Sequence, residues 1–212
     1  MVNYLARVGW SYDDKTEIFS CDELIRYFDL SGVNSSPARF SYERLEWMYG
    51  YYIRQLDAGD LAARLVPFLV GAGFGVTVGA LMPIVPLVQE RLKTLSDVVD
   101  WAGFFFEPEL EYDPRLLIGK KMTARQSLDA LQQARAALDA QPDLAPDTTE
   151  PLLRAQASDA GLKAGQLFGI VRVALTGRTV APPLFETMDV LGKTRVMRRI
   201  DCAIESLSSL ET

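Results

Sequence analysis

The apolar residues of this chain recur every three or four positions, which is the spacing that gathers them on one face of an α-helix. No segment alternates apolar and polar residues at every second position, as a half-buried β-strand would. The pattern therefore predicts an all-α protein. The clearest helical faces comprise Leu45, Met48, Tyr52 and Leu56; Leu128, Leu131 and Leu138; and Val196, Ile200, Ala203, Ile204, Leu207 and Leu210.

Two helix starts carry a reciprocal capping signal. In this pattern a hydroxyl side chain and a Glu or Gln three positions later each accept a hydrogen bond from the other residue's backbone N–H. The first pair is Ser20 with Glu23, and the second is Thr123 with Gln126. Each pair predicts a helix that begins at the residue after the hydroxyl.

The run from Leu65 to Val88 carries no charge over 24 residues, which on length alone would satisfy a membrane-spanning helix. Four glycines and three prolines interrupt it, and the backbone breaks they cause are hard to satisfy in lipid. We therefore expect a helix to about Val70, a glycine-rich turn, and a second helix from about Val78 to Leu95 with a proline-distorted start.

Two further stretches divide the helical pattern. Residues 141–151 hold three prolines and three acids, and they are predicted to form a solvated connector. The aromatic run Phe104–Phe106 is followed by Glu-Pro-Glu and by Pro114, which predicts a junction between two helical bundles. Pro182 or Pro183 is expected to open a helix, because proline is tolerated in a first turn.

The residues that usually carry catalysis or bind metals are scarce. The chain has no histidine, and its two cysteines, Cys21 and Cys202, are far apart in sequence, so neither a disulfide framework nor a zinc site is supported. No carboxylate pair has a histidine or metal-ligand partner, so no catalytic residue is predicted. The first residues lack a secretory signal pattern and are expected to form a helix ending near Gly9. A reduced, cytoplasmic setting fits best.

Two glycine-containing stretches superficially match phosphate-binding loops. Residues 71–75 have Val76 where a dinucleotide fingerprint needs a glycine or another small residue. The end of a P-loop is matched by residues 192–194, but Thr187 stands where the earlier glycine is required. A helix start with an exposed Lys193 is the better interpretation, and no nucleotide cofactor is predicted for this chain.

Charge is distributed unevenly. The net charge of −6 argues against nucleic acid at first, because Lys and Arg supply most non-specific affinity for phosphates. Residues 161–200, however, contain seven basic residues against two acidic ones. This stretch could form a basic face that binds RNA or an ordinary solvated helix surface, and charge alone leaves both open.

The stretch with the most distinctive order of residues runs from position 9 to position 54. In order, it contains Gly9-Trp10-Ser11, Phe19-Ser20, Asp22-Glu23, Val33-Asn34, Ser36-Pro37-Ala38, Phe40, Trp47-Met48 and Tyr52-Ile53-Arg54. This order resembles the middle of the bacterial-type glutamyl-tRNA synthetases. Tyr49 departs from the family pattern, which usually has Asn at that position.

The resemblance implies a helical connecting segment followed by two helical anticodon-binding bundles. Residues 1–56 would end the stem-contact domain, residues 57–103 would form the first anticodon-binding domain and residues 104–212 the second. The implied function is recognition of the glutamate tRNA anticodon without the catalytic Rossmann-type domain, whose ATP signature is rich in histidine. ATP and Mg²⁺ would serve the full enzyme and not this chain. The implied partners are glutamate tRNA and the catalytic domain, with no membrane and no DNA.

The resemblance also implies the site. Arg91 occupies the position that reads the third anticodon base in similar synthetases, where Arg accompanies restriction to glutamate tRNA and Gln accompanies relaxed choice. Arg172 would bond a base or its neighbouring phosphate, and Pro182, Leu184 and Phe185 would form an apolar wall under the anticodon bases. The residues themselves leave open that Arg91 is a solvated surface side chain and that the wall belongs to the core.

Contacts with the tRNA backbone are expected from the basic residues that follow the wall, namely Lys193, Arg195, Arg198 and Arg199. Ala181 stands where a hydroxyl residue can occur in the family, which removes one possible hydrogen bond. The alternative function is a free-standing helical module, derived from the synthetase, that binds proteins or RNA.

Overall fold

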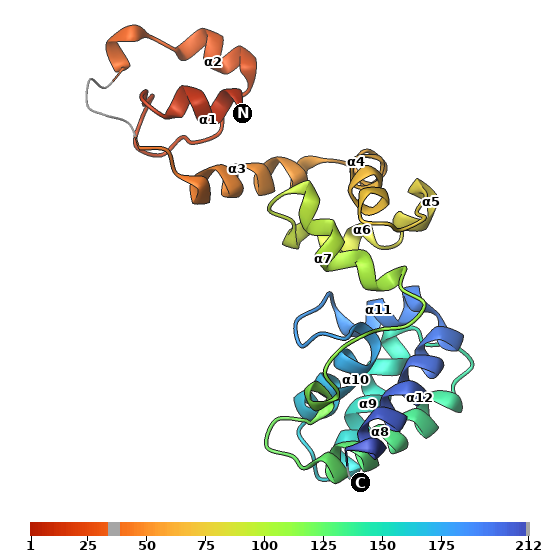
Figure 1. Cartoon of the computed structure of the whole chain (residues 1–212). Coiled ribbons are helices and arrows are strands. Elements are labelled where there is room, and N and C mark those ends of the chain that lie inside the picture. Colours follow the sequence, from red (N-terminus) through yellow and green to blue (C-terminus); the bar gives the residue numbers. More distant parts are fainter. Residues whose placement is uncertain (34–38, 211–212) are drawn as a thin grey trace.

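Helices make up nearly all the regular structure of this computed structural model, which describes residues 1–33 and 39–210 (Figure 1). Within these residues there is no strand, only an isolated bridge between Trp10 and Val33, and the predicted all-α class is confirmed. Four residues used for the resemblance, Asn34, Ser36, Pro37 and Ala38, lie outside the described part.

The chain is elongated, with a small lobe at one end, a long helix that leaves it, and two bundles that follow (Figure 1). The lobe contains α1 (Val2–Arg7), α2 (Cys21–Tyr27) and η1 (Leu30–Gly32), and the long helix is α3 (Tyr42–Gln55). The first bundle contains α4 (Ala58–Gly71), α5 (Val78–Leu81), α6 (Val85–Val88), η2 (Gln89–Arg91), η3 (Leu95–Asp97), α7 (Val98–Ala102) and η4 (Gly103–Phe105). The second contains η5 (Pro114–Leu117), α8 (Ala124–Asp139), α9 (Pro146–Asp159), α10 (Ala164–Thr176), α11 (Leu184–Leu191) and α12 (Lys193–Ser209).

The predicted helix starts agree with these bounds. Both reciprocal caps are formed, with Ser20 and Glu23 opening α2 and Thr123 and Gln126 opening α8. Pro183 immediately precedes α11, as expected for a proline at a helix start. The first helix ends at Arg7, close to the predicted end near Gly9.

The uncharged run breaks where the glycines predict, but the helix expected from Val78 to Leu95 is wrong. That span contains α5, α6 and η2, with short non-helical links between some of them. The reason is that Pro83 and Pro86 each lack an N–H, so each leaves a gap in the helical hydrogen-bond ladder. No helix in the described part of the chain is long and apolar enough to cross a membrane.

The predicted connector at residues 141–151 is also only partly correct. Helix α9 begins at Pro146, so half of this stretch is helical. Leu144 and Thr149 are buried against the second bundle. Proline fits a first turn, where its missing N–H has no partner to lose, and Pro146 therefore starts the helix instead of preventing it.

One apolar core runs through both bundles. It extends from Ile53 to Leu207 and includes Phe104 and Phe105 of the junction, which are almost fully buried. The lobe has two smaller clusters of its own, centred on Met48 and on Trp10. The domain boundaries at residues 56 and 103 therefore stay a prediction, since the core is continuous across both of them.

Gly50 allows α3 to approach the chain that follows η2. A Cβ placed on Gly50 would lie 3.3 Å from the backbone oxygen of Leu92 and 3.0 Å from Nη1 of Arg54. The helix and the following segment are therefore in contact at a position where only glycine fits without displacement.

We expect Gly50→Ala to destabilise the protein by about 1–2 kcal/mol, because the backbone oxygen cannot move away as a side chain could. The measurement is urea unfolding followed by circular dichroism. Gly71→Ala is the matched control: Gly71 also lies in a helix but has open space around its Cβ position. Equal effects of the two substitutions would contradict this account of the close approach.

Candidate functional site

Arg91 is presented by a short segment that is fixed on both sides. It ends η2, between the buried residues Val88 and Leu92. The side-chain amide of Gln89 donates hydrogen bonds to the backbone oxygens of Ile53 (3.0 Å) and Leu56 (2.9 Å), at the end of α3. The exposed Arg91 guanidinium lies over the ring of Trp101, 5.1 Å from its centre.

The turn after Arg91 is closed by the carboxylate of Asp97. It accepts hydrogen bonds from the backbone N–H of Lys93 (2.9 Å), and from the backbone N–H (3.0 Å) and hydroxyl (2.6 Å) of Thr94. Burial acts to raise the pKa of Asp97, but the hydrogen bonds from Thr94 and Lys93 outweigh it and hold the pKa below its usual value. The backbone that carries Arg91 is thus held from its C-terminal side as well.

Arg172 comes from the other bundle, on α10, and is near enough to Arg91 for the charge of that residue to act on it. Its side chain is half-buried, and its pKa is lowered first by that burial and then by the positive charge of Arg91. Among the described residues neither guanidinium has a carboxylate partner or a hydrogen-bond acceptor. The structure therefore brings together the two arginines that the sequence singled out and leaves both without a counter-ion.

The predicted apolar wall lies mostly inside the protein. Leu184 is 4% exposed and Phe185 is 8% exposed, with its ring edge-to-face against Phe168 at 5.1 Å. Pro182 is buried too. Leu184 and Phe185 form the start of α11 and Pro182 lies just before it, and the three offer little surface on which a base could rest. The neighbouring Val180, which is 66% exposed, is the apolar side chain that the adjoining loop presents to solvent.

The residues proposed to contact the tRNA backbone form contacts within the protein. The Nζ atom of Lys193 donates to the backbone oxygens of Asp139 (2.7 Å) and Gln141 (2.5 Å), where α8 ends. Arg198 pairs with the carboxylate of Glu109 at 2.9 Å, and both side chains are largely exposed. An exposed pair of this kind is weak, so Arg198 remains free to exchange its partner.

Arg199 is the most deeply placed of these residues, at 5% exposed. Its guanidinium donates to the backbone oxygens of Leu175 (2.5 Å), Phe104 (2.7 Å) and Glu107 (2.9 Å). Burial, followed by the charge of Arg195, lowers the pKa of Arg199 to about 10, so the group stays charged at neutral pH. The structure argues against Arg199 as a phosphate contact, and we exclude it from the interface.

Two more arginines bind the same segment. Arg195 donates to the backbone oxygen of Phe105 at 2.6 Å, and Arg178 donates to that of Asp100. We call Arg178, Arg195 and Arg199 the carbonyl clamp. It attaches the second bundle to the backbone between residues 100 and 107.

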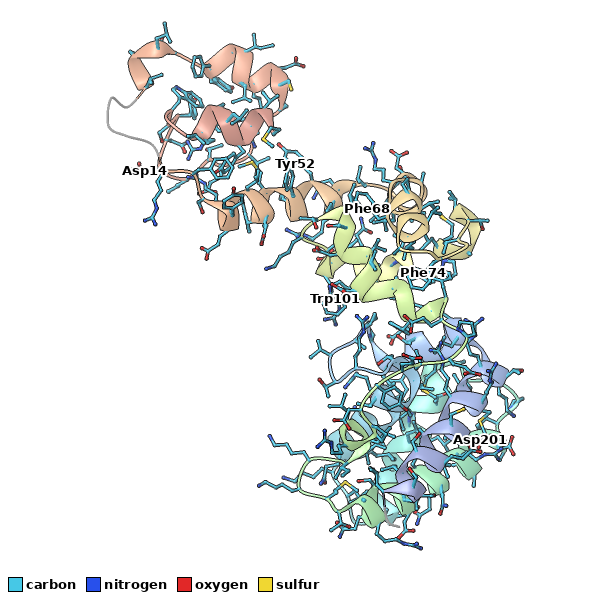
Figure 2. The ribbon with its side chains drawn as sticks, in the orientation of Figure 1. Asp14, Tyr52, Phe68, Phe74, Trp101 and Asp201 are labelled. Atoms are coloured by element: carbon cyan, nitrogen blue, oxygen red, sulfur yellow. The ribbon has the colours of Figure 1, made fainter. Side chains whose placement is uncertain are left out.

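Trp101 is the site residue that the sequence analysis missed. It lies on α7, half-buried, and Figure 2 shows it on the side of that helix that faces the second bundle. It was assigned no role in the sequence analysis. Its proximity to Arg91 depends on how α7 folds back beside η2, and no local pattern encodes that fold.

An all-helical chain with two arginines lacking counter-ions, one from each bundle, has the form of a module that recognises an anionic partner. A family model described as an anticodon binding domain matches residues 60–204, and the chain belongs to this family. The chain is 46% identical to glutamate–tRNA ligases of Dehalococcoides mccartyi strain BAV1 and of Roseiflexus castenholzii, over 99% of its own length in each comparison.

The chain spans less than half the length of these relatives, 44% and 42% respectively. Among solved structures, a glutamate tRNA ligase from Elizabethkingia meningosepticum is similar over 97% of this chain and 40% of its own, with a TM-score of 0.84 and 27% identity. A glutamate–tRNA synthetase from Elizabethkingia anophelis gives a TM-score of 0.80 at 26% identity, over 96% of this chain and 40% of its own. The resemblance to the glutamyl-tRNA synthetases is confirmed.

Arg199→Ala should destabilise the protein by about 3–5 kcal/mol, because it leaves three buried backbone oxygens without donors. Arg199→Lys should recover only part of this loss, since an ammonium cannot reproduce the planar fork. Arg198→Ala, next to it but exposed, is the control and should change stability by less than about 0.5 kcal/mol. Chemical unfolding measures all three, and an Arg199→Ala as stable as the control would contradict the clamp.

Proposed function

We propose that this chain recognises the anticodon loop of glutamate tRNA, as the anticodon-binding portion of a glutamate–tRNA ligase. The observation that carries the proposal is the approach of Arg91 and Arg172 from separate bundles without any acidic partner among the described residues. Two like charges held close together are unfavourable by themselves, and a polyanion relieves the repulsion. Family membership and the similarity to glutamate–tRNA ligases support the same conclusion.

The chemistry of an anticodon suits this arrangement. Unpaired loop bases expose their hydrogen-bonding edges and can stack on flat side chains. The guanidinium fork makes two directed hydrogen bonds to a base edge or a phosphate, whereas a lysine offers only a point charge. We assign the third anticodon base to Arg91, and a base or adjacent phosphate to Arg172. Arg198, whose ion pair is exposed, is retained as a backbone contact.

Neither a nucleotide site nor a metal site is part of the function proposed for this chain. Among the described residues no three His, Cys, Asp or Glu side chains cluster so that they could hold a metal ion. We therefore assign ATP and Mg²⁺ to the part of the relatives' length that this chain does not span, and no chemical step to this chain. The proposal also includes a cytoplasmic location and glutamate tRNA as the binding partner.

We expect Arg91→Gln to reduce discrimination between glutamate tRNA and a tRNA changed at the third anticodon base. The reduction should be about tenfold or more, because one bidentate arginine–base contact contributes about 1–3 kcal/mol of selectivity. Arg172→Ala should weaken the binding of both tRNAs and lessen the salt dependence of that binding. Fluorescence anisotropy with labelled tRNAs at several salt concentrations measures both effects.

Arg125→Gln is the matched control. Arg125 pairs with Asp129 at 3.1 Å near the start of α8, at the opposite end of that helix from Lys193's contacts. Identical behaviour of the Arg91, Arg172 and Arg125 variants would contradict the assigned roles. If the chain itself does not bind tRNA at moderate salt, the alternative of a helical protein-binding module replaces the proposal.

The chain should bind tRNA without charging it. Incubation with ATP, glutamate and glutamate tRNA is expected to give no aminoacyl-tRNA above background, because the proposal assigns no chemical step to this chain. Acid-gel separation of charged and uncharged tRNA gives the readout. Charging by the purified chain would overturn the assignment of the chemistry to a part outside it.

A further inference from the structure

The Arg91 side chain has no polar anchor of its own. It lies at the last residue of η2 and is exposed, and within residues 1–33 and 39–210 no hydrogen bond or ion pair holds its guanidinium. The adjacent acid, Glu90, is directed to Arg54 instead, at 3.9 Å. A long flexible side chain in this situation samples many rotamers, whereas selective recognition of one base edge needs the guanidinium plane in one orientation.

Trp101 offers that orientation. Its ring centre lies 5.1 Å from the Arg91 guanidinium carbon, within the range of a cation–π interaction, for which tryptophan is the strongest partner. The indole is itself held, because Trp101 is half-buried and packs against the core shared by the two bundles. A face fixed by the core therefore limits the orientations open to an otherwise unattached guanidinium.

The charge of Arg172 is a reason why the Arg91 guanidinium needs to be oriented by another side chain. The pKa of Arg172 is lowered first by its burial and then by the positive charge of Arg91, so the two guanidinium groups repel each other. Alone, this repulsion favours rotamers in which Arg91 turns away into solvent. The attraction between the indole face and the guanidinium opposes that tendency before any RNA is bound.

We propose that Trp101 is a positioning residue that determines specificity: its indole face orients Arg91 so that the guanidinium fork meets the third anticodon base. This inference rests on the proposed function, because it assigns Trp101 a role in that same site. Trp101 acts through Arg91. Removing the indole therefore affects discrimination between anticodons more than the overall affinity for tRNA.

The test compares dissociation constants for glutamate tRNA and for a tRNA changed at the third anticodon base, using the full chain. Trp101→Leu keeps apolar volume against the core but removes the aromatic face, and it should lower the ratio of the two constants by about threefold to tenfold. Trp101→Phe, with a weaker aromatic face, should retain part of the ratio. Thermal unfolding of both variants checks that the fold is kept.

A double substitution tests whether the effect of Trp101 on discrimination depends on Arg91. If Trp101 acts through Arg91, adding Trp101→Leu to Arg91→Gln should cause no further loss of discrimination. A Trp101→Leu variant that weakens both tRNAs equally would show that the indole stacks on RNA or only supports the fold, and would overturn the inference. Full discrimination in Trp101→Leu, with discrimination lost in Arg91→Gln, would also overturn it while the proposed function stands. If the unsubstituted chain binds both tRNAs with the same affinity, then Arg91 does not read the third anticodon base. That outcome contradicts the proposed function itself, and with it the role of Trp101.

Discussion

The buried guanidinium of Arg199 is the interaction on which the arrangement of the two bundles depends. It joins the end of α10 to the backbone after η4 through three oxygens, in a place where an unpaired charge would be very unfavourable. Arg195 binds the backbone oxygen of Phe105, between the two residues of this segment that Arg199 binds, and Arg178 binds that of Asp100 before them. Because η2 and α7 belong to one bundle and α10 to the other, the spacing of Arg91 and Arg172 follows from this attachment.

The basic stretch at residues 161–200 has two roles that its charge count cannot separate. Lys193, Arg178, Arg195 and Arg199 satisfy backbone oxygens, and this fixes the structure. Arg172 satisfies none, and this leaves it available to a partner. A protein with a net charge of −6 can thus present a small, sharply defined positive site, while the rest of its surface discourages indiscriminate contact with nucleic acid.

The features that could be predicted from sequence are those set by local chemistry. The caps at Ser20 and Thr123 depend on neighbours three residues away and were correct. The helical faces depend on spacing and were correct for most of their residues, but Tyr52 and Leu210 are exposed. The extended helix from Val78 was wrong because two prolines outweighed an apolar pattern that helices and buried turns share. Burial of Phe185 and the meeting of Trp101 with Arg91 arise from long-range packing, which periodicity does not report.

The hydrogen bonds of Gln89 to the backbone oxygens of Ile53 and Leu56 join the segment bearing Arg91 to the C-terminal end of α3. With 14 residues at about 1.5 Å each, α3 is about 21 Å long, so a tilt of about 5° at its Gln89 end would displace its first turn by about 2 Å. The small lobe rests on that first turn through Tyr4, whose hydroxyl meets the backbone of Ser41. Strain at the segment bearing Arg91 would therefore reach the far tip of the molecule as a change of angle.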